Sequence, residues 1–105
     1  MEKFMYKMIA VFKVPSDVES FDKYYQDIHT PITKKVPGIK EFRVSKVFGT
    51  PRGKSDLHLI LELIFATKED FKNALNSPEM MASGKDTSNF AKDLVSVHFA
   101  EEKLV

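Results

Sequence analysis

The sequence predicts an α+β domain in which helices cover one face of a four-stranded antiparallel sheet. Four segments have the apolar content and length of strands, and helical patterns separate the first from the second and the third from the fourth. A loop rich in glycine and proline joins the second and third strands. The resulting order of strand, helix, strand, strand, helix, strand is the split βαβ, or ferredoxin-like, arrangement.

The first predicted strand extends from Phe4 to Val14 and ends before Pro15. Its β-branched and aromatic residues fit a strand that is buried on both faces. Ser16 and Glu19 have the spacing of a capping box, which predicts that a helix begins here.

The first predicted helix carries one apolar stripe. Its members recur at spacings of three and four residues: Val18, Phe21, Tyr25, Ile28 and Ile32. Pro31 lacks a backbone donor and its ring crowds the preceding turn. We therefore expect the helix to end or kink at His29–Thr30, with a short extra turn up to Lys35.

The second predicted strand covers Ile39–Phe48, and a turn-rich loop follows from Gly49 to Ser55. The third strand, Leu57–Phe65, alternates most clearly. Its leucines and Phe65 share one face of the sheet. The other face carries Asp56, His58, Ile60, Glu62 and Ile64.

The second half of the chain contains two helix starts. Thr67 is the expected N-cap of one helix, and Pro78 fits the first position of another. Gly84 weakens helical propensity, so the stretch up to Lys92 is open between helix, loop and two pieces. The last predicted strand is Leu94–Ala100, with His98 on the face opposite to Val95, Val97 and Phe99.

Composition excludes several classes of protein. The 105 residues fit one domain, residues 1–105, and 16 basic against 15 acidic residues give a net charge of +1, which argues against electrostatic binding of nucleic acid. The absence of cysteine removes disulfides, thiol nucleophiles and thiolate metal sites. No apolar run reaches the roughly 20 residues needed to span a bilayer, and the segment from Met1 to Lys7 is too polar for a signal peptide. We expect a soluble, cytoplasmic protein with no membrane partner.

A homodimer is expected from the face of the sheet that the helices leave open. That face still carries apolar side chains, including Ile9, Val11, Ile60 and Ile64. An exposed apolar patch of this size usually marks an interface, so we expect two copies to pair through their sheets. The alternative is a thicker core within one chain.

His29 is the strongest candidate for chemistry. Histidine can donate or accept a proton near neutral pH, and this one borders the apolar stripe near the predicted helix end. It could therefore face the edge of a pocket. The alternative is a boundary histidine that caps helix carbonyls.

Fewer sequence features indicate a functional role for the other candidate residues. His58, Glu62 and His98 share the less apolar faces of their strands, but groups on strands three and four lie at least about 9–10 Å apart, so we expect no metal site. A substrate-polarising role for His58 or His98 and a simple polar belt both stay open. Tyr25 could donate a phenolic hydrogen bond or only pack in the core. The loop from Gly49 to Ser55 lacks both the glycine spacing and the following helix of a phosphate-binding loop.

The ordered set of motifs resembles the EthD domain family, named for a component of ethyl tert-butyl ether degradation. The similarity rests on Phe21-Asp22-x-Tyr24-Tyr25-x-x-x-His29-x-Pro31-Ile32 and on the following Val36-Pro37-Gly38-Ile39. The resemblance implies a ferredoxin-like unit that pairs into a dimeric α+β barrel. Related barrels include methylmuconolactone isomerases, polyketide cyclases and cofactor-independent monooxygenases. His29 matches the histidine suspected of acid–base work in this family, whereas Phe42 stands where the isomerase-like branch has a tyrosine.

Together these observations predict a dimer that binds a small, largely apolar metabolite between sheet and helices. His29 would be the catalytic acid or base, with Tyr25, Phe42, His58 and His98 lining the substrate pocket. The expected chemistry is proton transfer or oxidation without a bound cofactor, in a degradation pathway. The alternatives are a non-catalytic accessory protein of a catabolic oxygenase system and a structural dimerisation module.

Overall fold

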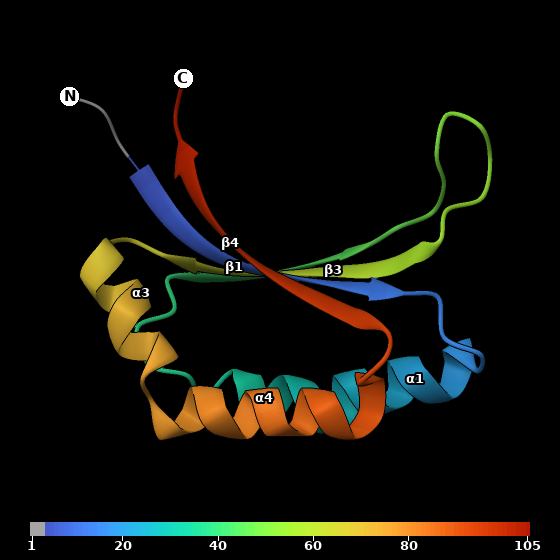
Figure 1. Ribbon diagram of the computed structural model, residues 1–105, viewed down its shortest axis with the longest axis horizontal. Helices are drawn as coiled ribbons and strands as arrows, with labels where there is room; N and C mark the ends of the chain where they lie inside the picture. The colour runs from blue at the N-terminus through green and yellow to red at the C-terminus, as the bar shows by residue number, and fades with distance from the viewer. Residues whose placement is uncertain (1–3) are drawn as a thin grey trace.

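A computed structural model describes residues 4–105, so the first three residues of the predicted N-terminal segment lie outside the described part. The strands are β1 (Phe4–Lys13), β2 (Glu41–Lys46), β3 (Leu57–Phe65) and β4 (Val95–Lys103). They form a four-stranded sheet in the order β2-β3-β1-β4 (Figure 1), and every neighbouring pair is antiparallel. The predicted ferredoxin-like fold is confirmed.

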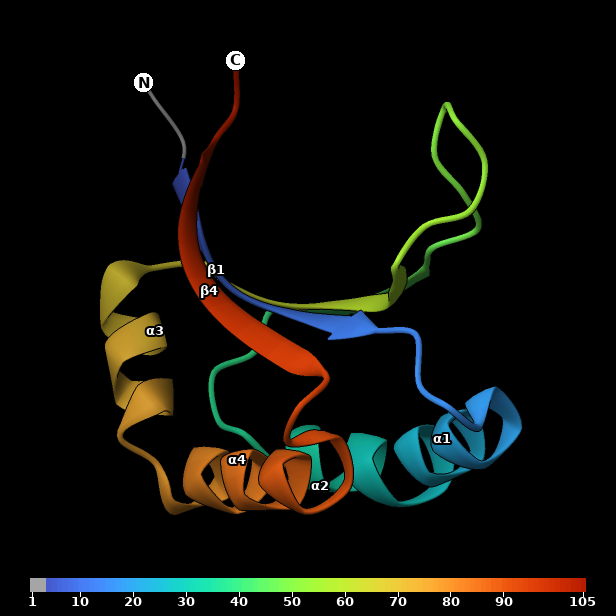
Figure 2. The same cartoon turned by 45° about the vertical axis from the view of Figure 1, so that its right-hand side comes forward.

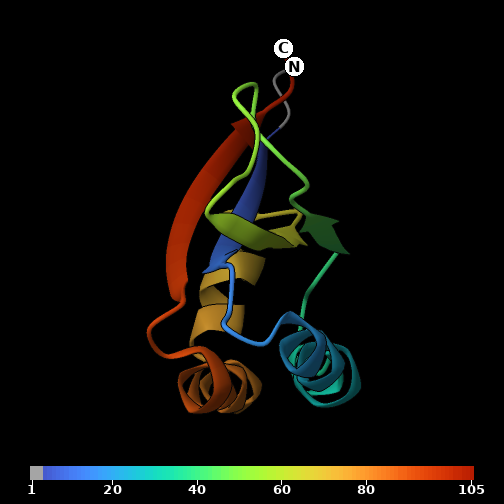
Figure 3. The same cartoon turned by 90° about the vertical axis from the view of Figure 1, so that its right-hand side faces the viewer.

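The helices lie on one face of this sheet. They are α1 (Val18–Tyr24), the π-helix η1 (Tyr25–His29), α2 (Thr30–Thr33), α3 (Lys68–Leu75) and α4 (Pro78–Ala91). Figure 3 shows the run from α1 to α2 lying beside α4 beneath the sheet, and Figure 2 shows α3 standing at one end of this layer. The helix layer thus has two parallel rows with the sheet above them.

Phe12 lies at the centre of the core, completely buried between sheet and helices. Its ring meets the edges of Phe21 and Tyr25, with ring centres 5.6 and 5.8 Å away. It also stacks on Phe90 of α4 at 6.2 Å. Aromatic contacts therefore join both helix rows to the central strand β1.

The first helix differs from its sequence prediction at both ends. Asp17, not Ser16, is the N-cap, because its carboxylate accepts from the backbone N–H of Ser20 at 3.0 Å. At the other end, the helical run does not end at His29–Thr30 but changes type there, and α2 supplies the predicted extra turn. The wide π-turn before the proline accommodates its ring and its missing donor, so the expected break becomes a change of helix type.

The other elements follow the predictions more closely. Thr67 and Ser77 cap α3 and α4 by accepting from backbone N–H groups. Helix α4 runs unbroken through Gly84, which settles the segment that the sequence left open. Strand β2 is shorter than Ile39–Phe48, and β4 continues three residues beyond Ala100.

A bulge at the end of β3 changes the direction of one histidine. Phe12 pairs with Leu59, but the next residue, Lys13, pairs with Leu57. His58 is the extra residue between them, and its side chain is turned to the helices, where it bonds to Asp22. The predicted position of His58 on the open face is therefore wrong, because a bulge breaks the alternation on which it rested.

The opposite face of the sheet carries no helix among the described residues. Ile9, Val11 and Ile60 lie there, only half-buried. Lys7 crosses this face, with Nζ 2.8 Å from Glu62 and 3.2 Å from Glu102. The hydrogen bond to Glu62 raises the pKa of Lys7 against the opposing effect of burial. No helix within residues 4–105 is long and apolar enough to cross a membrane.

Candidate active site

His29 and Asp86 form a buried pair between the two helix rows. His29 comes from η1 and is only 2% exposed, and Asp86 comes from α4. Nδ1 of the imidazole lies 2.8 Å from Oδ2 of the carboxylate. Because an ionised carboxylate can only accept, Nδ1 is the donor, and in the neutral imidazole Nε2 then presents a lone pair.

The surroundings of Nε2 leave it weakly engaged. Thr33 Oγ1 lies 3.3 Å away and Thr87 Oγ1 lies 3.5 Å away, both long for hydrogen bonds. Thr87 donates its proton to the carbonyl of Ser83 at 2.9 Å, so it can accept from Nε2 once that nitrogen is protonated. The site can therefore hold the imidazole in either protonation state.

A cavity of about 330 Å³ opens beside His29. It lies between the sheet and α4, and its wall is mainly apolar, with Met8, Leu61, Met80, Val97 and Phe99 among the lining residues. Thr87, whose hydroxyl lies near Nε2, also lines it, as does Ser83, whose hydroxyl lies 2.7 Å from that of Thr33. The basic nitrogen thus lies at the polar end of an apolar pocket, the arrangement expected of a small-molecule site.

Tyr24 provides a second tie to Asp86. Its hydroxyl donates to Oδ1 at 2.6 Å, and this hydrogen bond raises the pKa of the Tyr24 phenol. One carboxylate therefore accepts from a residue of α1 and from a residue of η1. A carboxylate fixed on both oxygens holds the imidazole ring in a single orientation.

Tyr25 lies next to His29 but lines a different cavity. Its ring centre is 5.6 Å from that of His29, yet Tyr25 does not line the cavity beside His29. It lines a separate cavity together with Val44 and Leu59. Burial raises the pKa of the Tyr25 phenol to about 12, against a smaller opposing effect of the Thr30 side chain.

Phe42 and His98 lie away from the His29 cavity. Phe42 packs half-buried against the core from β2, and it lines neither this cavity nor the one beside Tyr25. His98 lies exposed on the open face, where it pairs with Ile9 across the strands and bonds to Ser96 Oγ at 3.1 Å. Because Val97 and Phe99 turn to the helix side, His98 must face away from it, so the expectation that it shares a pocket with His29 is wrong.

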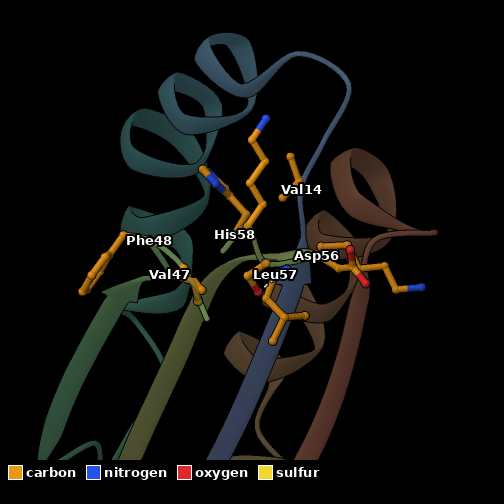
Figure 4. Close-up of a pocket in the computed structure, with 10 residues that line it drawn as sticks. Val14, Val47, Phe48, Asp56, Leu57 and His58 are labelled. Carbon is orange, nitrogen blue, oxygen red and sulfur yellow. Dashed lines mark hydrogen bonds between the residues drawn. The ribbon is translucent and has the colours of Figure 1, made fainter. Parts of the chain in front are cut away.

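His58 forms a second histidine–aspartate pair. Its Nε2 lies 2.6 Å from Asp22 Oδ1, and its ring meets the edge of Phe21 at 5.7 Å. His58 also lines an open pocket of about 600 Å³ at the base of the β2–β3 hairpin, with Val14 and Phe48 among the other wall residues (Figure 4). The structure places His58 on the helix side, but not in the cavity beside His29.

Three residues of this site were not predicted from the sequence: Asp86, Ser83 and Thr87. Their spacing of three and four residues puts them on one face of α4, which is a signal that the sequence contains. That signal has meaning only once the segment around Gly84 is known to be helical. Within residues 4–105, no three His, Asp or Glu side chains are grouped so that they could hold a metal ion.

The fold and this cavity define a class of protein: a ferredoxin-like α+β domain with a histidine–aspartate pair at the polar end of a pocket between sheet and helices. The family model of the EthD domain matches residues 13–93. The chain belongs to the EthD domain family.

Two relatives cover nearly the whole chain. An uncharacterised 11.0 kDa protein from the thcB–thcC intergenic region of Rhodococcus erythropolis is 29% identical over 101 residues, which is 96% of this chain and 98% of that protein. The crystal structure of an EthD family protein from Bacillus halodurans is 36% identical, with a TM-score of 0.89 over 93% of this chain and 98% of that chain.

A more distant structure shares only the fold. It is described as a dimeric protein of unknown function with a ferredoxin-like fold, from Bacteroides fragilis. It is 19% identical, with a TM-score of 0.60 over 95% of this chain and 96% of that chain.

Proposed function

We propose that the cavity beside His29 binds a small, largely apolar metabolite and that His29 transfers a proton to or from it without a bound cofactor. The observation that carries this proposal is the 2.8 Å bond between Nδ1 and Asp86. In the neutral imidazole this bond assigns the free lone pair to Nε2, on the edge of the ring beside the Thr87 hydroxyl, and Thr87 lines the cavity. Asp86 is a positioning residue in this scheme, and Tyr24 fixes Asp86 in turn.

The chemistry of the wall supports a largely apolar ligand. Its aliphatic and aromatic residues favour a hydrocarbon body, while the hydroxyls of Ser83 and Thr87 provide a few polar contacts at one end. The small, largely apolar metabolite expected from the sequence is compatible with this wall.

A generic proton-abstraction probe tests the proposal without knowledge of the natural substrate. In 5-nitrobenzisoxazole, a base removes the ring C–H proton, the N–O bond breaks, and a cyano-substituted phenolate leaves. We expect saturable turnover by the wild-type protein. His29→Gln should reduce turnover by about 10²- to 10⁴-fold, the usual contribution of a general base.

The matched control is His98→Gln, since His98 lies exposed on the other face of the sheet. This variant should keep wild-type turnover. Amide NMR shifts at Met80 and Val97 report whether the probe occupies the cavity. Occupancy without His29-dependent turnover would overturn the catalytic proposal and favour the alternative of a binding or accessory protein.

We also propose that a second copy of the chain covers the open face of the sheet. The half-buried Ile9, Val11 and Ile60 support this, and so does the dimeric state described for a structure of the same fold. Sedimentation analysis at micromolar concentration should give the mass of a dimer. A stable monomer under those conditions would exclude the proposed pairing.

A further inference from the structure

The open pocket of about 600 Å³ at the base of the β2–β3 hairpin lies where β1 ends and β3 begins. Two backbone hydrogen bonds join the segments around it. The Val14 N–H donates to the carbonyl of Asp56 and the Val47 N–H donates to the carbonyl of His58, both at 2.9 Å. Among the described residues, none that lines this pocket also lines the cavity beside His29, so the two sites have separate walls.

Two contacts hold the His58 ring in place. Its Nε2 lies 2.6 Å from Asp22 Oδ1, and its ring meets the edge of Phe21 with the ring centres 5.7 Å apart. An ionised carboxylate can only accept, so Nε2 is the donor of the bond to Asp22. In the neutral imidazole, Nδ1 then carries a lone pair whose direction the two contacts fix.

Nδ1 is the atom through which His58 reaches the pocket. Within residues 4–105 this nitrogen has no hydrogen-bond partner, and the Tyr25 hydroxyl is the only side-chain polar atom that is both unpaired and closed to solvent. Solvent therefore reaches Nδ1, although His58 as a whole is only 5% exposed. Because His58 lines the pocket, its unpaired lone pair is available to a donor that enters there.

The bulge in β3 is what brings this ring to the pocket. His58 is the extra residue between two regular pairs of the β1–β3 ladder, and strict alternation would have placed it on the open face of the sheet. Bulges are over-represented next to active sites, where the extra residue redirects a side chain. The local backbone thus departs from a regular strand at the residue that presents the free acceptor.

The charges around the pocket balance. Lys13, Lys54 and Asp56 line it. Asp22 adds a second carboxylate at the other nitrogen of His58. Two ammonium groups therefore stand against two carboxylates, which favours a ligand without net charge.

The rest of the wall includes an aliphatic surface. Val14, which is 46% exposed, lines the pocket together with Val47 and Leu57. Figure 4 shows Val14, Leu57 and His58 lying together, whereas the ring of Phe48 points away from them. An aliphatic surface beside one fixed polar atom is suited to a small ligand with an apolar body.

We propose that this pocket binds a small neutral alcohol or phenol, whose hydroxyl donates a hydrogen bond to His58 Nδ1 and whose apolar body packs on Val14, Val47 and Leu57. The lone pair selects against ketones and ethers, because those groups have no proton to donate. This binding does not depend on the proton transfer proposed for His29.

The probe 4-methylphenol tests the proposal, and 4-methylanisole is its comparator because methylation removes the hydroxyl proton. Amide NMR of the full chain should show saturable shifts at Val14, Val47 and Leu57. The phenol should bind about 3- to 10-fold more tightly than the ether, the value of one neutral hydrogen bond. Equal binding of the two would overturn the proposal, and so would tighter binding of the anion 4-methylbenzoate than of the phenol.

His58→Gln tests the acceptor itself. A glutamine amide can donate to Asp22 in place of Nε2, but it puts no acceptor at the position of Nδ1. The preference for the phenol over the ether should therefore disappear in this variant, and its retention would contradict the assignment. The matched control is His98→Gln, on the other face of the sheet, which should keep the full preference.

A measurement on the wild-type protein covers the case in which His58→Gln does not fold. The ¹⁵N NMR signal of His58 Nδ1 should shift when 4-methylphenol saturates the pocket, and it should shift much less with 4-methylanisole. Amide shifts at Met80 and Val97 separate this event from binding in the cavity beside His29. A His58 Nδ1 signal that stays in place at saturation would rule out the proposed hydrogen bond.

Discussion

Replacing Asp86 by asparagine tests the two hydrogen bonds that its carboxylate accepts in the site. The carboxylate accepts from Tyr24 at 2.6 Å and from His29 Nδ1 at 2.8 Å, and its side chain is only 12% exposed. Hydrogen bonds to a charged group contribute about 1.5–3 kcal/mol each. An asparagine has one oxygen and one NH₂ group, so it can accept from one of the two donors but presents a donor to the other.

The free energy of unfolding should therefore fall by about 2 kcal/mol, since one charged bond becomes neutral and the other must be rearranged. For a domain of this size that corresponds to a loss of about 8–16 °C in Tm. His29 relieves the donor conflict by moving its proton from Nδ1 to Nε2. The lone pair on the cavity side is then lost, and proton abstraction should fall with it.

Thermal unfolding measures the stability, and ¹⁵N NMR of the imidazole measures which nitrogen is protonated. Asp93→Asn is the matched control, because Asp93 is exposed just after the end of α4 and should leave both readouts unchanged. A drop of less than about 2 °C in Asp86→Asn would refute the energetic reasoning. Retention of the proton on Nδ1 would refute the positioning role of Asp86.

Three further predictions concern the cavity, the buried phenol and the core. Gly84 lines the His29 cavity, and a Cβ there would meet no atom within 4 Å. Gly84→Ala should therefore raise the free energy of unfolding by up to about 1 kcal/mol in urea titrations, and a destabilised Gly84→Ala would contradict this. Gly84→Leu should fill the cavity and exclude the nitrobenzisoxazole probe. The pKa of Tyr25 is about 12 in the folded chain and 10.0 in the unfolded chain, so its stabilising contribution is complete below pH 10 and is lost as pH rises to 12, by about 3 kcal/mol. Urea titrations of Tyr25→Phe should show a smaller decline over that range, and an identical decline would exclude this phenol as its source. Phe12→Ala removes the fully buried ring that joins both helix rows and should lower the free energy of unfolding by about 3–5 kcal/mol; a loss below about 1 kcal/mol would mean that the core collapses around the gap.

The fold could be predicted because its signals are local. The alternation in Leu57–Phe65, the cap at Thr67 and the proline at the first position of α4 each act over a few residues. The same kind of rule predicted from Pro31 that the helix would end or kink at His29–Thr30, and the structure instead changes helix type there, because the preceding π-turn accommodates the proline.

The site depends on contacts that no local rule contains. Asp86 reaches His29 across 57 positions of the sequence, and only the packing of α4 beside η1 brings them together. The direction of His58 depends on one extra residue in β3, which has no glycine to mark it. His29 itself could be selected, because its residue type and its place beside the apolar stripe were visible in the sequence.

The two hydrogen bonds that Asp86 accepts have an evolutionary consequence. The same carboxylate ties the two helix rows together and orients the imidazole, so selection cannot change one property without changing the other. A substitution that removes these hydrogen bonds lowers protein abundance, because it destabilises the fold, and it also changes the orientation of the imidazole. Among proteins with this arrangement, sequence divergence should therefore accumulate in the cavity wall, where side chains can change size, while Tyr24, His29 and Asp86 stay constant.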